Sequence, residues 1–241
     1  MKSSANYLSK VQPATIALIA FAYFVIAVTA LYFLNPAYSL IRSFAGYYDL
    51  GAYEFLIAST FFSLGLGSLA LVIGLYQGMA QSARSWIGLL LLGIWGVGML
   101  MSGIFPANDG GSTVPHMTTV LLAGIFPVEV QATPETVFSF IHIIAILGSL
   151  FSLSLAAIVL SWRFKHEEKW HPIYKSALIL AVVMIAVSIL FCSVLLYPAL
   201  VGYSGLINPI ILVVIGIVVG LFWLSLIAGR LYLMGAHTVL E

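Results

Sequence analysis

A single histidine lies inside a long apolar stretch of this chain. His142 is the only residue with an ionisable side chain in the run 137–161. Glu135, Ser139, His142 and Ser149 are four, three and seven residues apart, a spacing that places them on one stripe of an α-helix. An ionisable group in an apolar helix is a candidate for function. We expect this stripe to face the bundle interior or a wet cavity, and a neutral histidine bonded to a neighbouring helix is the structural alternative.

Two other segments bring polar groups toward the same membrane surface. Pro106 ends the apolar run 85–104, and Asn108 and Asp109 follow it in a glycine-rich turn. Asp49 lies shortly before the run 55–76, where a carboxylate also favours the start of a helix. Ordinary turn and helix-start roles would explain these residues. The functional alternative is one outward-facing pocket that binds a ligand or ion, built from Asp49, Asn108, Asp109, Glu135, Ser139 and His142.

Three of the outer residues could hold a metal ion. Asp109, His116 and His142 carry carboxylate and imidazole groups, the ligands of catalytic zinc sites. A metal-assisted hydrolase or transferase at the outer surface is therefore one hypothesis, although no H-E-x-x-H or G-x-S-x-G motif occurs. A haem held by His116 and His142 is a weaker one, because His116 lies in a loop. The sequence identifies no cofactor.

Six apolar stretches must position these groups. Each is close to the 20 or so residues that an α-helix needs to cross a bilayer. With 62% hydrophobic and 7% charged residues, a soluble protein would have too little polar surface. We therefore predict an all-α polytopic membrane protein, a six-helix bundle that forms one domain over residues 1–241. The expected spans are 15–34, 55–76, 85–104, 137–161, 176–197 and 208–229.

The basic residues predict the orientation of the bundle. One side holds eight of them: Lys2, Lys10, Arg84, Arg163, Lys165, Lys169, Lys175 and Arg230. The opposite loops hold only Arg42, so the positive-inside rule places both termini in the cytoplasm. The net charge is +1 and the cations form no stripe, so we expect no nucleic-acid partner. The one cysteine, Cys192, excludes an intrachain disulfide.

Three segments carry a family resemblance. They are Asn35–Arg42 with Tyr48–Gly51, then Gly103–Asp109, and then Phe138–Ala145. Together they resemble the prokaryotic membrane family catalogued as domain of unknown function 998, and more distantly the damage-regulated autophagy modulator group. The resemblance covers nearly the whole chain and implies a six-helix fold in a prokaryotic inner membrane, without an established reaction. It favours His142 over His116 as the family's histidine, and Asn108 occupies a position where the family pattern is acidic.

Function is left open among several classes. A binding or structural membrane protein needs only the helices and their small residues, such as Gly216 and Gly220. It would use the outward-facing polar pocket and intramembrane grooves to hold membrane lipid, a small ligand or a partner membrane subunit. The metal-assisted enzyme is the alternative. A transporter would be expected to show broken helices or repeated charges at mid-membrane, and neither is evident.

Overall fold

The computed structural model describes residues 2–34, 53–105, 134–201 and 209–237, and these residues contain helices and turns but no strand. Each helix contains a segment of 19 to 26 residues that is long and apolar enough to cross a membrane. The protein is therefore an integral multi-pass membrane protein, and the predicted all-α fold is confirmed. The helices are α1 (Lys2–Leu34), α3 (Glu54–Gly78), α4 (Trp86–Ile104), α6 (Pro134–Phe164), α7 (His171–Val201) and α8 (Pro209–His237).

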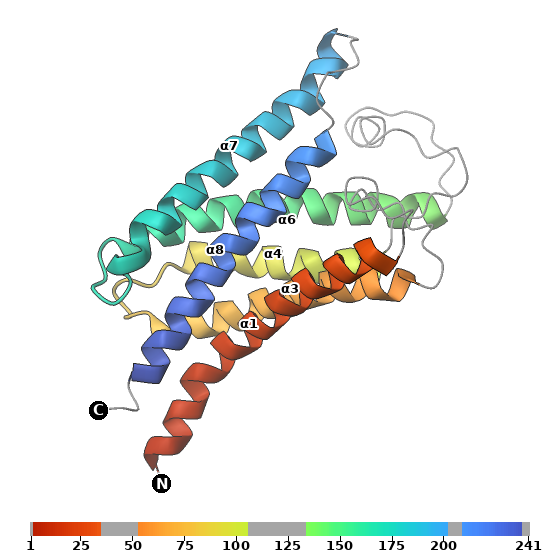
Figure 1. The fold of residues 1–241 in the computed structure, drawn as a ribbon. Coiled ribbons are helices and arrows are strands. Elements are labelled where there is room, and N and C mark those ends of the chain that lie inside the picture. Colours follow the sequence, from red (N-terminus) through yellow and green to blue (C-terminus); the bar gives the residue numbers. More distant parts are fainter. Residues whose placement is uncertain (1, 35–52, 106–133, 202–208, 238–241) are drawn as a thin grey trace.

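The helices pack in the order in which they follow one another along the chain. Each packs on the next, and α8 also packs on α1, which closes the ring; α8 makes further contacts with α3 and α6. In Figure 1, α1 begins and α8 ends at the same end of the bundle as the turns that join α3 to α4 and α6 to α7. Short turns explain the antiparallel packing of α3 on α4 and of α6 on α7, the two pairs whose connections the structure describes.

Several helices run past the predicted spans. The helix α1 starts at Lys2 and contains Pro13, and α7 extends from His171 through Pro198 to Val201. The expected span 176–197, with a loop starting at Pro198, is therefore too short at both ends. Proline removes one backbone donor, but membrane helices tolerate it when neighbouring groups satisfy the freed carbonyl. Continuing the helix also keeps backbone groups paired where the chain leaves the apolar part of the bilayer.

Serine and tryptophan side chains link the helices inside the bundle. Trp95 Nε1 on α4 donates a hydrogen bond to Ser68 Oγ on α3 at 2.8 Å. Trp223 Nε1 on α8 donates to Ser161 Oγ on α6 at 3.1 Å. Both tryptophans are buried, so each indole N–H needs an acceptor within the protein. These pairs fix the facing sides of the helices that carry them.

The outside of the bundle is a belt of large apolar side chains. Ile26 of α1, Leu90 of α4 and Phe222 of α8 are 67%, 66% and 65% exposed. A continuous apolar surface of this kind would make a protein aggregate in water, whereas in a bilayer it faces lipid tails. The helices therefore present an apolar surface to the membrane on the side that does not pack on neighbours.

Candidate functional site

His142 lies inside the bundle and binds the end of a neighbouring helix. It is 1% exposed, and its Nδ1 lies 3.0 Å from the carbonyl oxygen of Ser102 and 2.8 Å from that of Phe105. Both neighbours are acceptors, so Nδ1 carries the hydrogen and donates it to them. The prediction that His142 faces the interior and is hydrogen-bonded is confirmed.

The carbonyl groups that His142 contacts belong to the last turn of α4. The final carbonyls of a helix have no partner within it, and their burial is costly unless another group bonds them. The Phe105 N–H closes this turn onto Met101 O at 2.9 Å, and His142 supplies the next donor from α6. The ring also meets Phe61 of α3 edge to face, with centroids 5.7 Å apart. The imidazole therefore joins three helices at the end of α4.

The other predicted site residues are not brought together by the described part of the structure. Asp49, Asn108, Asp109 and His116 lie outside the described residues. Glu135 and Ser139 belong to the first turns of α6, and their side chains also lie outside the described set. Among the residues that the structure describes, no three His, Cys, Asp or Glu side chains form a group that could hold a metal. The polar pocket and its metal thus stay predictions.

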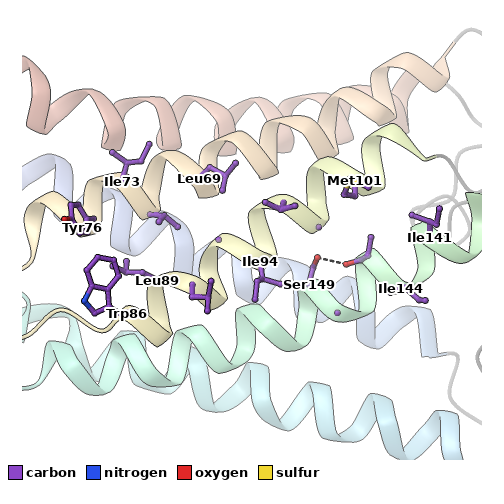
Figure 2. A pocket seen from close by; sticks show the side chains of 17 residues that line it. Leu69, Ile73, Tyr76, Trp86, Leu89, Ile94, Met101, Ile141, Ile144 and Ser149 are labelled. Atoms are coloured by element: carbon purple, nitrogen blue, oxygen red, sulfur yellow. Dashed lines mark hydrogen bonds between the residues drawn. The ribbon is translucent and has the colours of Figure 1, made fainter. Parts of the chain in front are cut away.

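A long apolar groove lies along the outer side of α4, between α3 and α6. Its volume is about 1080 Å³. Figure 2 shows its lining side chains in a row that runs from Tyr76 and Trp86 at one end to Met101 and Ile141 at the other. The side chains and glycines that line it are Leu69, Val72, Ile73, Tyr76, Trp86, Leu89, Leu90, Gly93, Ile94, Val97, Gly98, Met101, Ile141, Ile144, Ala145, Gly148 and Ser149.

Close helix packing on both sides of α4 forms the walls of this groove. A Cβ atom on Gly65 of α3 would lie 2.8 Å from the carbonyl oxygen of Gly96. On the other side, a Cβ atom on Gly98 would lie 3.1 Å from the carbonyl oxygen of Ala145 on α6. These glycines let the backbones approach, which is how small residues pack membrane helices. The short α4, 19 residues against 25 and 31, is held between its two longer neighbours.

Gly93 and Gly148 line the groove but, unlike Gly65 and Gly98, face open space. A Cβ atom added to Gly93 or to Gly148 would meet no heavy atom of the described chain within 4 Å. Both residues line the groove, one from α4 and the other from α6. They do not bring helices together, and their effect is to leave space open along the groove.

An aromatic pair and an arginine lie at one end of the groove. The rings of Tyr76 and Trp86 are 5.4 Å apart, and the guanidinium carbon of Arg84 lies 4.0 Å from the centroid of the Tyr76 ring. The helix α4 begins beside them, where the Ser85 hydroxyl accepts the Gly88 N–H at 3.2 Å. This cap fixes the first turn of α4 and hence the position of Trp86.

Comparison with known proteins gives a family but no activity. The family of proteins of unknown function designated DUF998 matches residues 18–229. The chain belongs to the DUF998 family. The match includes the three segments that carry the resemblance, so that prediction is confirmed at the level of the family. No curated protein and no solved structure matches the chain.

Sequence reasoning identified His142 and expected intramembrane grooves, but it did not locate the groove along α4. The signal was present in Gly93 and Gly148, but both were indistinguishable from packing glycines such as Gly96 and Gly98. Arg84 was recognised only as one of the cations that set the orientation. A sequence without contacts does not tell which glycines face a neighbouring helix and which face open space.

Proposed function

We propose that this integral membrane protein binds lipid and holds the hydrocarbon chain of one lipid molecule in the groove formed by α3, α4 and α6. The observation that carries the proposal is the open space at Gly93 and Gly148. A glycine inside a helix costs about 1 kcal/mol relative to alanine. Neither glycine offsets that cost by helix packing among the described residues. Gly229 is equally open but lies away from the groove, so it is the position of Gly93 and Gly148 on two facing walls of one groove that favours a bound chain.

The dimensions of the groove suit an acyl chain. Its lining on α4 runs from Trp86 to Met101, about 22 Å at 1.5 Å per residue. One leaflet of the hydrocarbon core is about 15 Å deep, half of the usual 30 Å. A chain that enters near Trp86 would therefore be covered along its whole depth in one leaflet.

The lining also favours hydrocarbon over a polar small molecule. Small-molecule sites usually place several polar groups around the ligand. Here Tyr76 and Trp86 lie at one end, and the Ser149 hydroxyl donates to Ala145 O within its own helix, as the dashed line in Figure 2 marks. The middle of the groove is lined by aliphatic side chains and glycine.

Filling the groove tests the proposal. Gly93→Leu and Gly148→Leu place a side chain where a Cβ atom has free space, so the bundle should keep its fold. Gly229→Leu on α8 is the matched control, because this glycine also has no described neighbour within 4 Å and does not line the groove. The readout is quenching of Trp86 fluorescence by lipids brominated on their acyl chains, taken as the difference from Trp86→Phe.

We expect strong Trp86 quenching in the unchanged protein and in Gly229→Leu, and a clear loss of quenching in both groove variants. The 66% exposure of Trp86 makes it accessible to a bound chain, whereas Trp95, Trp170 and Trp223 are buried. Trp162 on α6 is also exposed, at 58%, and its quenching is removed by the subtraction of Trp86→Phe. Equal quenching in all four proteins would show that lipid contacts Trp86 without occupying the groove, and would overturn the proposal.

The cellular setting forms part of the same proposal. The distribution of basic residues supports cytoplasmic termini. The family resemblance favours the inner membrane of a prokaryotic cell and a distant relationship to the damage-regulated autophagy modulator group. The bound lipid would then belong to the membrane that contains the protein, with a partner membrane subunit as a further candidate ligand of the exposed helix faces.

A metal-assisted hydrolase or transferase has one observation in its favour. Histidines that bind metals usually donate their other ring N–H to a carbonyl or carboxylate, and His142 donates Nδ1–H to Ser102 and Phe105 carbonyls. The test is metal analysis of the purified protein beside His142→Ala and Asp109→Ala. Stoichiometric zinc or another divalent metal that both substitutions remove would support this alternative, and metal-free protein after purification with zinc would contradict it.

A further inference from the structure

We infer that the lipid held in the groove is an anionic phospholipid whose phosphate binds Arg84. This inference rests on the proposed function, since it names the head group of the lipid whose chain the groove would hold. It is carried by the position of one cation at the end of the groove and by the donors which that cation has available.

The guanidinium group lies beside the end of the groove, against a side chain that lines it. It lies over the ring of Tyr76, 4.0 Å from the centroid, and Tyr76 itself lines the groove beside Trp86. Tyrosine and tryptophan are enriched at the level of lipid head groups, where an amphipathic ring contacts both water and hydrocarbon. A phospholipid with its chain in the groove would therefore have its phosphate near Arg84.

The described chain uses few of the hydrogen-bond donors of Arg84. Its one hydrogen bond in the described structure joins an Nη2 donor to Met79 O at 3.4 Å, which is long. Its Nε is buried from solvent and has no hydrogen-bond partner in the described part of the chain. Arginine has five N–H donors in a planar fork that matches two phosphate oxygens, so a bound phosphate would satisfy several of them together.

The acidic side chains at this end of the bundle, Glu167 and Glu168, line a second cleft. Glu167 accepts the Ala80 N–H at 3.1 Å. Together with Glu168 it lines a separate cleft of about 450 Å³ against the ends of α3 and α8. Met79, whose carbonyl accepts from Arg84, lines the same cleft, but neither carboxylate forms an ion pair with Arg84 among the described residues.

The test measures which lipids stay bound. The full-length protein is reconstituted in vesicles of equal parts phosphatidylglycerol and phosphatidylcholine, extracted in mild detergent, and analysed by native mass spectrometry. We expect phosphatidylglycerol to be enriched about fivefold over phosphatidylcholine, the factor that corresponds to the roughly 1 kcal/mol contributed by one arginine near anionic lipid. Arg84→Gln should reduce this ratio to about one, and Arg84→Lys should give an intermediate ratio because it keeps the charge and loses the fork.

The control is Arg163→Gln, which removes an exposed cation from the last turn of α6 and should leave the ratio unchanged. Equal loss in Arg84→Gln and Arg163→Gln would mean general attraction to the basic side of the bundle, and would overturn the inference.

Gly93→Leu separates the two proposals by total bound lipid. If it lowers that total while Arg84→Gln leaves the ratio near five, the groove stands and the anionic head-group site fails. If Gly93→Leu leaves the total unchanged, the groove itself fails.

Discussion

Nδ1 of His142 donates a hydrogen bond across 2.8 Å to the carbonyl oxygen of Phe105, so a side chain of α6 closes the end of α4. The same N–H is shared with Ser102 O at 3.0 Å. An intramembrane histidine is usually examined first as a functional group. Here it has at least one structural role, because it satisfies helix-end carbonyls at a depth where water is scarce.

Loss of this N–H should destabilise the bundle. His142→Phe keeps a planar ring and removes the donor, leaving the Ser102 and Phe105 carbonyls without it. We expect a loss of about 1–3 kcal/mol in the free energy of unfolding, the usual cost of a buried group deprived of its partner. Thermal unfolding in detergent measures it. His171→Phe, at the exposed start of α7, should change little, and equal midpoints for the two variants would contradict the capping role.

Two glycines of α4 should respond in opposite directions to the same change. Gly98→Ala places a methyl group 3.1 Å from Ala145 O and in collision with the Ser149 hydroxyl, so α4 and α6 must separate. Gly93→Ala meets open space and gains helix propensity, about 1 kcal/mol. We expect the unfolding midpoint to fall for Gly98→Ala and to rise or stay unchanged for Gly93→Ala.

The Ser149 hydroxyl provides a check on that explanation. In a Ser149→Ala background the worst contact of Gly98→Ala is removed, while the neighbours at 3.1 and 3.2 Å remain. The loss caused by Gly98→Ala should therefore become smaller but not vanish. Identical losses in both backgrounds would show that the collision with Ser149 is not the source of the destabilisation.

The fold was predictable because each span contains enough apolar residues to be recognised by length alone. The C-terminal end of α7 was not predictable, because proline usually ends a helix in a soluble protein, whereas the membrane helix α7 continues through Pro198. His142 was predictable because it is the lone ionisable residue of its span.

The position of the groove could not be predicted from the sequence, for a physical reason. In a soluble helix the polar residues mark the outer face, but α4 is apolar all round, so lipid-facing Leu90 and buried Leu92 look alike in the sequence. Gly93 and Gly98 differ only in what lies opposite them. The proposed outer pocket is hard to predict for another reason. Asp49 and Asp109 lie in long segments between the expected spans, where the sequence has no periodicity from which a structure could be inferred.

The bond between Trp95 and Ser68 should show measurable coupling. Ser68→Ala leaves the buried indole N–H of Trp95 without its acceptor, whereas Trp95→Phe removes the donor. A double-mutant cycle isolates the pair from the separate cost of the smaller ring. We expect a coupling energy of about 0.6 kcal/mol, and no more than about 2, as found for hydrogen bonds between membrane helices. Additive losses would show that the two helices are held by packing alone.

The orientation of the bundle gives the last prediction, because Arg84 can meet the anionic inner leaflet only if its end of the bundle is cytoplasmic. The reason is the division of basic residues, eight on one side and Arg42 on the other.

Labelling of single cysteines measures this orientation. Cys192, the free cysteine, is first replaced by serine, and single cysteines are then placed at Ser112 and Glu168. Glu168 is chosen because it is exposed, whereas neighbouring Glu167 bonds Ala80. A membrane-impermeant thiol reagent should label position 112 in intact cells and position 168 only in inverted vesicles. The reverse pattern would place both termini outside and would contradict the predicted orientation.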